Sequence, residues 1–410
     1  MWRGDSGGRR TERAMINALS SLRKMRTAVV LALLLSALAA ADAHGALPIA
    51  VTDDGAIITL RKQGEQLVVR DHHSVRIVLP RGARASSLTS DPQPAVAAIS
   101  PDGLRVLAVV LGSVDKAAAW RVAATTWRRG QRTARLQWLS PPGRSVETTP
   151  SIDVTRERAA VAWTMSRPFA PAVAVRTRRR WHTRELTPAG PRPSQTLETA
   201  VELPRGEGPP LVMWPVDRGA VASWDDKPVG LPAAGSTARG LHGQQLLAAN
   251  GTAVMGWLDL ESPSAHLAWR KSTGRLHTVE LGRSVTGFAG FPSIATRGGR
   301  FVMAWSGADE HVRVRMGRLG GRLSPVRRLG SIAGYEWPRV IIDQRGRAHI
   351  VFSSFSVTRA VTVTPDARVI SRRSVRGGQC SPPPLLASPS GRHVIAVLPC
   401  RGNRVLRLGP

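Results

Sequence analysis

The sequence predicts an all-β fold made of repeated antiparallel sheets, and three observations lead to that class. Short apolar segments recur in pairs along almost the whole chain, and the two segments of each pair are joined by a turn with Gly, Asp or Asn. Glycine and proline, 39 and 30 residues, fall mainly between the pairs. No segment shows the 3.6-residue apolar period of a long amphipathic helix.

Eight copies of this hairpin are present, and their starts lie 45 to 55 residues apart. The copies begin at Ile49, Val96, Ser151, Ala200, Gln245, Ser293, Arg339 and Leu385. This period is typical of the four-stranded blades of a β-propeller. A stacked solenoid would have a similar period, but the short last unit favours a closed ring, which removes exposed sheet edges.

The blade number stays open between eight and seven, with eight favoured. The last unit has room for only three strands, near 385–388, 393–398 and 404–408. It is either an incomplete eighth blade, or the N-terminal strands complete a seventh. Within a unit, Phe301–Trp305 is apolar at every position, as expected for a strand buried on both faces. Segments 312–316 and 361–363 alternate with polar residues and suit outer strands.

One aromatic residue closes the second strand in five consecutive units. These residues are Trp163, Trp214, Trp257, Trp305 and Phe352. Their regular placement predicts one large side chain per blade, packed between neighbouring sheets. An aromatic platform for sugars is the alternative interpretation.

The N-terminal segment is typical of a secretory signal peptide. Arg23, Lys24 and Arg26 precede an apolar run from Ala28 to Ala40, and residues 41–43 form an A-x-A cleavage site. That run is shorter than the ~20 residues of a membrane-spanning helix. We expect residues 1–43 to be removed after Ala43, residues 44–410 to form a single β-propeller domain, and the product to be secreted or to stay in the periplasm or cell wall. Met25 is an alternative start to Met1.

The chain is strongly basic, with a formal net charge of +30. Seven basic and three acidic residues precede position 44, which leaves 51 basic and 25 acidic residues, or +26. Only five basic residues are lysines and 53 are arginines, a usage typical of GC-rich bacterial genomes. A non-specific basic surface is the favoured interpretation, and attraction to wall polymers, acidic glycans, lipid headgroups or DNA is the alternative.

The two cysteines flank the last hairpin symmetrically about Ser390, with Cys380 before its first strand and Cys400 after its second. An oxidising compartment favours a disulfide between them, which would stabilise the terminal blade by about 3 kcal/mol. A reactive thiol pair is the alternative.

Ser100-Pro101-Asp102-Gly103 resembles the S-P-D-G repeat of TolB-type and WD-like bacterial propellers, and the other copies keep its hydrophobic frame. This resemblance covers residues 47–410 and implies a propeller architecture. A weaker similarity to sialidase-type propellers rests on Ser151-Ile152-Asp153, part of an Asp-box in which Thr155 replaces the glycine. It would imply Tyr335 and Glu336 as nucleophile and base, although strand alternation points adjacent residues to opposite faces.

Other chemical motifs favour structural roles. Gly4-Asp5-Ser6-Gly7-Gly8 matches G-x-S-x-G but precedes the signal peptide. The carboxylate pairs Asp53-Asp54 and Asp225-Asp226, the sequence Asn250-Gly251 and the basic run 178–181 fit turns or an outer strand. His72-His73 is an isolated pair without metal-ligand spacing. We therefore expect no cofactor and no metal.

The sequence predicts a monomeric, exported, non-catalytic binding or scaffold propeller, whose partner is a protein or glycan outside the cytoplasm. A sialidase-like glycan hydrolase or lyase, with carboxylates gathered from several blades, is the first alternative. A polyanion-binding protein that uses its basic surface is the second.

Overall fold

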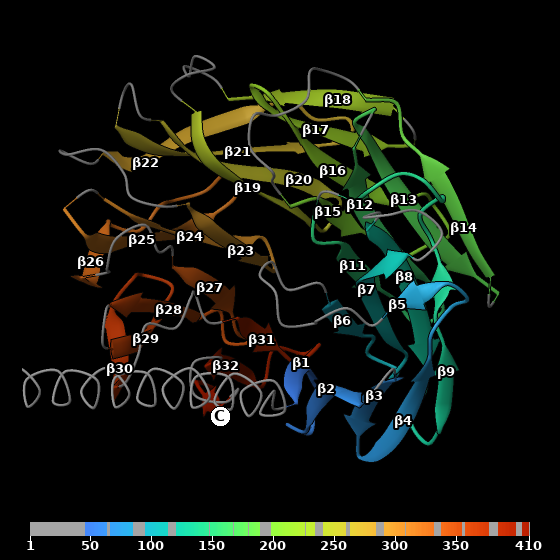
Figure 1. The fold of residues 1–410 in the computed structure, drawn as a ribbon. Coiled ribbons are helices and arrows are strands. Elements are labelled where there is room, and N and C mark those ends of the chain that lie inside the picture. Colours follow the sequence, from blue (N-terminus) through green and yellow to red (C-terminus); the bar gives the residue numbers. More distant parts are fainter. Residues whose placement is uncertain are drawn as a thin grey trace, which may run out of the picture. The chain divides into compact units, whose positions relative to one another are not determined.

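The computed structural model describes residues 46–409, apart from 64–65, 85–94, 114–119, 147, 167, 179, 189–197, 226, 234–240, 260–262, 284–290, 308, 332–337, 355–356, 377–383 and 399–403. The chain separates into two compact units, residues 1–45 and 46–410, and all described residues belong to the second. Every regular element described is a β-strand, and the described residues contain no helix able to cross a membrane. The strands form eight successive sheets (Figure 1).

Five of the sheets have four antiparallel strands paired in chain order. Blade 3 contains β11 (Ser151–Val154), β12 (Ala159–Met165), β13 (Ala170–Thr177) and β14 (Arg180–Glu185). Blade 4 contains β15 (Ala200–Glu202), β16 (Leu211–Val216), β17 (Gly219–Trp224) and β18 (Lys227–Pro232). Blade 5 contains β19 (Leu241–Ala249), β20 (Thr252–Asp259), β21 (Ser264–Lys271) and β22 (His277–Arg283).

Blades 6 and 7 repeat this order. Blade 6 contains β23 (Ser293–Arg297), β24 (Arg300–Ser306), β25 (His311–Arg318) and β26 (Arg327–Ser331). Blade 7 contains β27 (Arg339–Ile342), β28 (Ala348–Ser354), β29 (Val357–Val363) and β30 (Val369–Arg376). The alternating segments 312–316 and 361–363 therefore lie in third strands, and the outermost strands are β26 and β30.

The chain that builds blade 2 also adds one strand to the sheet of blade 1. Blade 1 contains β1 (Leu47–Val51), β2 (Ile57–Gln63), β3 (Gln66–Asp71) and β4 (His73–Val78). Blade 2 contains β5 (Ala83–Arg84), β6 (Ala95–Ile99), β7 (Arg105–Ser113), β8 (Trp120–Trp127) and β10 (Gln137–Trp138). Between β8 and β10, β9 (Thr133–Arg135) leaves blade 2 and pairs in parallel with β4, which links the two sheets through backbone hydrogen bonds.

Blade 8 contains three described strands, β31 (Leu385–Ala387), β32 (Val394–Leu398) and β33 (Arg404–Arg407). They fall at the positions expected from the sequence. The N-terminal strands build a sheet of their own and do not complete this one, so the prediction of eight blades is confirmed.

The first strands of the blades form a closed circle. Each of β1, β6, β11, β15, β19, β23, β27 and β31 lies against the next, and β31 lies against β1. Figure 1 shows blade 1 in blue beside blade 8 in red. Residues 46–409 therefore form a closed eight-bladed β-propeller.

The hydrophobic core is divided into wedges between neighbouring blades. One buried cluster joins blades 1 and 2 and another joins blades 2 and 3, and the pattern continues around the ring. Val51 of blade 1 packs with Ile395 and Val397 of blade 8 and completes the circle. Since both faces of each sheet are covered, the second strands are apolar at nearly every position.

The hairpin turns are built from a recurring five-residue pattern. In Thr52–Ala56, Ser100–Leu104 and Asp343–Arg347, the first residue bonds through its backbone with the fifth, and its carbonyl accepts from the glycine at the fourth position. These glycines have φ of 74° to 84°, where a Cβ would be strained. The S-P-D-G letters noted in the sequence belong to this turn.

Candidate functional site

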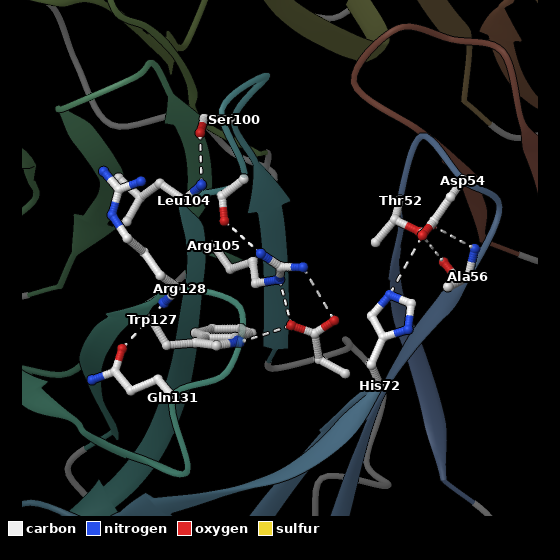
Figure 2. A network of polar contacts seen from close by, with 12 residues as sticks. Thr52, Asp54, Ala56, His72, Ser100, Leu104, Arg105, Trp127, Arg128 and Gln131 are labelled. Carbon is white, nitrogen blue, oxygen red and sulfur yellow. Dashed lines mark hydrogen bonds and ion pairs between the residues drawn. The ribbon is translucent and has the colours of Figure 1, made fainter.

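A buried ion pair joins blades 1 and 2. Arg105, at the start of β7, forms a two-point contact with the carboxylate of Asp71, at the end of β3, through Nε and through Nη2 at 3.2 Å (Figure 2). The indole Nε1 of Trp127 donates to the same carboxylate at 3.4 Å. The Asp71 and Arg105 side chains are almost fully buried. A carboxylate held by a guanidinium at both oxygens is poorly placed for proton transfer, so this group is structural.

The predicted carboxylate pair lies in the β1–β2 turn. Asp54 accepts a hydrogen bond from the Thr52 hydroxyl, which lowers its pKa, and lies 3.6 Å from Nε2 of His72 (Figure 2). Asp53 reaches the last blade, where the Ser390 backbone N–H and hydroxyl donate to its Oδ1 at 2.9 and 2.6 Å. Burial opposes ionisation of Asp53, but these two bonds outweigh it and lower the pKa. Asp54 therefore stabilises the β1–β2 turn, and Asp53 connects blade 1 to blade 8, where the ring closes.

Two carboxylates on adjacent innermost strands have raised pKa values. Burial raises the pKa of Asp153 on β11, although the Leu203 backbone N–H donates to its Oδ2 at 2.7 Å. Burial also raises the pKa of Glu202 on β15, and the charge of Asp153 adds to the effect. The Gly251 N–H donates to Glu202 Oε2 at 2.8 Å. Each carboxylate therefore accepts a hydrogen bond from a backbone N–H group of the next blade. Gln245 continues the series, since its Oε1 accepts from the Ile294 N–H at 2.5 Å.

A serine and a histidine meet on blade 5. Ser264 Oγ lies 2.5 Å from His266 Nε2, and the imidazole stacks on Trp257 with ring centroids 5.0 Å apart. Burial lowers the pKa of His266, while Glu280 and Asp259 act in the opposite direction. A serine nucleophile must meet its substrate, and the Ser264 side chain is fully buried. The geometry fits a hydrogen bond within the packed sheet better than a catalytic dyad.

Blade 7 holds a second buried polar cluster. Asp343 Oδ2 lies 2.7 Å from Arg347 Nε and 3.2 Å from His349 Nε2, and His349 Nδ1 lies 3.1 Å from the Thr362 hydroxyl. Burial favours protonation of Asp343, but the bonds from His349 and Arg347 prevail and lower its pKa to about 2. This cluster fixes the β27–β28 turn.

Arginines link neighbouring blades through backbone carbonyls. Arg158 of blade 3 donates to Gly206 O and Gly208 O of blade 4 at 2.6 and 2.7 Å. The same use of guanidinium donors recurs at Arg144, Arg315, Arg359, Arg372, Arg373 and Arg407. A planar fork of five N–H donors suits such bridges better than an ammonium group does. Nothing in the sequence marks these arginines, or Asp71 and Arg105, because their partners are distant along the chain.

The five predicted packing aromatics all lie fully buried at blade interfaces. Each occurs in a cluster with the preceding blade: Trp163 with blade 2, Trp214 with blade 3, Trp257 with blade 4, Trp305 with blade 5 and Phe352 with blade 6. None of them is exposed as a sugar platform would be.

Several other predicted features lie outside the described residues. These are Cys380, Cys400, Tyr335, Glu336, Asp226, Arg179 and the signal segment 1–43. Asn250 and Gly251, with φ of 52° and 67°, form the two-residue turn between β19 and β20. Within the described ranges, no group of three or more His, Cys, Asp or Glu side chains is placed to hold a metal ion.

No protein-family model matches the chain, and no curated protein sequence matches it. Among solved structures, the chain is similar to the BP39L lectin from Burkholderia pseudomallei, with 12% identity, 78% of this chain and 95% of that chain covered, and a TM-score of 0.49. It is also similar to the six-bladed Aleuria aurantia lectin, with 12% identity, 70% and 95% covered, and a TM-score of 0.40.

A further similar structure is a mutant Trypanosoma rangeli sialidase displaying trans-sialidase activity, with 11% identity and a TM-score of 0.39. The match covers 86% of this chain and 54% of the sialidase, so the chain spans about half of that protein. At these scores the likeness carries no inference about ligand or activity.

Proposed function

We propose that this chain is an exported, non-catalytic β-propeller that binds a ligand outside the cytoplasm. The observation that carries the proposal is that the acidic side chains are engaged in hydrogen bonds that hold the fold together. Among the described residues, each carboxyl group with a clearly shifted pKa accepts a hydrogen bond within a turn, within a blade or between blades. Carboxylates engaged in this way support packing more than general acid–base catalysis.

The wider assignment also belongs to this proposal. The Ser100–Gly103 turn and the repeat frame support a relation to TolB-type and WD-like propellers of bacteria. The signal segment supports export, and the disulfide predicted between Cys380 and Cys400 would suit the oxidising compartment that follows. A closed ring with rigid sheets gives a scaffold on which loops can bind without rearrangement of the core.

The second candidate function is a glycan hydrolase, and one observation favours it. Asp153 and Glu202 lie on adjacent innermost strands, and both have raised pKa values. A general acid requires a carboxyl group whose pKa is raised. Their backbone hydrogen bonds count against this role, since each carboxylate already bridges two blades.

The test uses the product secreted by a bacterial host that expresses the full chain. N-terminal sequencing should begin at His44 if export and cleavage occur as proposed. The purified protein is then applied to a glycan array and incubated with the same glycans, and release of reducing ends is measured. Binding without release supports the proposal. Release that disappears in Asp153→Asn or Glu202→Gln would establish the hydrolase instead.

A further inference from the structure

The outer edge of blades 6 to 8 carries an unusual concentration of arginine. Strands β26, β30 and β33 contain seven arginines among 17 residues and no acidic residue. The outermost strands of blades 3 to 5, β14, β18 and β22, contain three arginines, one lysine and two glutamates in 19 residues. The outermost strands of blades 6 to 8 are therefore richer in arginine than those of blades 3 to 5.

These three strands lie side by side. Arg372 of β30 donates to Leu329 O of β26 at 2.7 Å, and Arg373 donates to Arg407 O of β33 at 2.6 Å. Together with the β29–β30 turn they form one surface, which we call the arginine edge. It consists of exposed residues Arg327, Arg328, Arg368, Arg372, Arg373, Arg376, Arg404 and Arg407.

Among the described residues, one carboxylate contacts an arginine of this surface and another lies in its turn. Asp309 contacts Arg313 at 2.7 Å and Arg328 at 3.6 Å, and Asp366 accepts from the Thr364 hydroxyl in the turn. Arginines therefore outnumber carboxylates on the described part of this edge. Like charges held together on a rigid sheet attract a polyanion, which relieves their repulsion and releases its own counterions.

Exposed aliphatic side chains accompany the charges. Val326 and Ile370 are 39% and 45% exposed, and among the described residues the only other large exposed hydrophobic side chain is Trp120 on blade 2. Val326 directly precedes β26, and Ile370 lies in β30. Apolar contacts beside cations fit a polymer that has both anionic groups and hydrocarbon faces, as a sugar ring does.

Resting on the proposed binding function, we infer that the arginine edge binds an acidic polysaccharide carrying carboxylate or sulfate groups. Single-stranded nucleic acid fits less well, because residues 324–331, 364–376 and 404–409 contain no aromatic side chain on which bases could stack. Duplex DNA fits less well too, because these flat strands offer no helix or projecting ribbon to enter a groove.

The test compares the secreted protein with two triple variants of equal charge. The edge variant carries Arg327→Gln, Arg368→Gln and Arg404→Gln, whose side chains have no hydrogen bond to another blade among the described contacts. The control variant carries Arg129→Gln, Arg132→Gln and Arg205→Gln, exposed positions on blades 2 and 4. Thermal unfolding verifies that all three proteins are equally folded. Affinities for heparin, polygalacturonate, neutral dextran and a single-stranded DNA oligomer are then measured.

The unmodified protein should bind at least one of the two acidic polysaccharides, with affinity that falls steeply between about 50 and 200 mM salt, and should not bind dextran. The edge variant should bind about tenfold more weakly, and the control variant less than twofold more weakly. Equal losses in both variants would show that net charge, not this edge, decides binding. Tighter binding of DNA than of both polysaccharides would overturn the ligand class. If the protein binds other glycans on the array but neither acidic polysaccharide, this inference is refuted and the proposed function is still supported.

Discussion

At the scale of single residues, many polar side chains in this protein connect one blade to the next. Asp71 with Arg105, Asp53 with Ser390, and Asp153 with Leu203 each join groups from different sheets. Because such groups are far apart in sequence, no spacing or motif predicts them. Local polar contacts are different, since the turn at Ser100–Gly103 can be read from four adjacent letters.

Removal of one partner from the Asp71–Arg105 pair should be strongly destabilising. Asp71→Leu leaves a buried, uncompensated guanidinium, and we expect a loss of roughly 3–5 kcal/mol in the free energy of unfolding. The double variant Asp71→Leu with Arg105→Met removes both charges and should recover most of that loss. Urea unfolding of the four proteins measures the coupling. Additive effects of the two substitutions would contradict the pairing.

Asp343 should make stability depend on pH at the acid end. Its pKa is lowered from 3.8 to about 2 in the folded protein. The folded state therefore binds this proton less tightly than the unfolded state, and stability falls as the pH drops from about 4 to 2. The contribution of this nearly fully buried group is on the order of 2 kcal/mol. Unfolding midpoints measured across this range should vary less in Asp343→Asn than in the unmodified protein, and parallel curves would contradict the assignment.

At the scale of elements, the sequence predicts the hairpins well and the third and fourth strands less well. The second strand of a blade, such as β24, is apolar at most positions because sheets cover both of its faces. Outer strands such as β18, with sequence KPVGLP, lack this pattern because one side meets water. The parallel pairing of β9 with β4 has no local signal, since it depends on how blade 2 approaches blade 1.

The second-strand aromatics give a prediction at this scale. We propose that Trp305 stabilises the interface between blades 5 and 6, where it packs with Leu258, Leu267 and Leu281. Trp305→Ala should cost about 3–5 kcal/mol of stability because it leaves a large cavity. Trp305→Phe should cost clearly less, since the indole Nε1 has no hydrogen-bond partner among the described residues. Thermal unfolding compares the two, with Trp120→Ala at an exposed position as the control. A Trp305→Ala protein as stable as that control would contradict the packing role.

At the scale of the whole molecule, the repeat period predicts a propeller but only the pairing of strands decides the blade count. Both eight and seven blades satisfy the sequence, because a C-terminal unit of three strands can stand alone or receive a strand from the N-terminus. In the structure the described C-terminal strands form a sheet of their own, and β1 to β4 belong to a different sheet. The ring is consequently closed by side chains and core packing at blades 8 and 1.

The predicted disulfide bears on this closure. If Cys380 and Cys400 are joined, the exported protein should have a mass lower by two hydrogens than its reduced form. Reduction, or Cys380→Ser with Cys400→Ser, should lower stability by about 3 kcal/mol. Hydrogen exchange followed by mass spectrometry should show the increase in β32 and β33 first. Two free thiols in the exported protein would rule out the bond.

Blade 1 is attached differently on its two sides, and this has a mechanical consequence. Toward blade 2 it is held by the strand β9, whose hydrogen bonds would have to be broken one after another or sheared together. Toward blade 8 it is held by short contacts such as Arg407 with Gly55. A protein stretched from its two ends in an optical trap should therefore release the C-terminal sheet at low force, while the first two sheets resist and come apart as one unit.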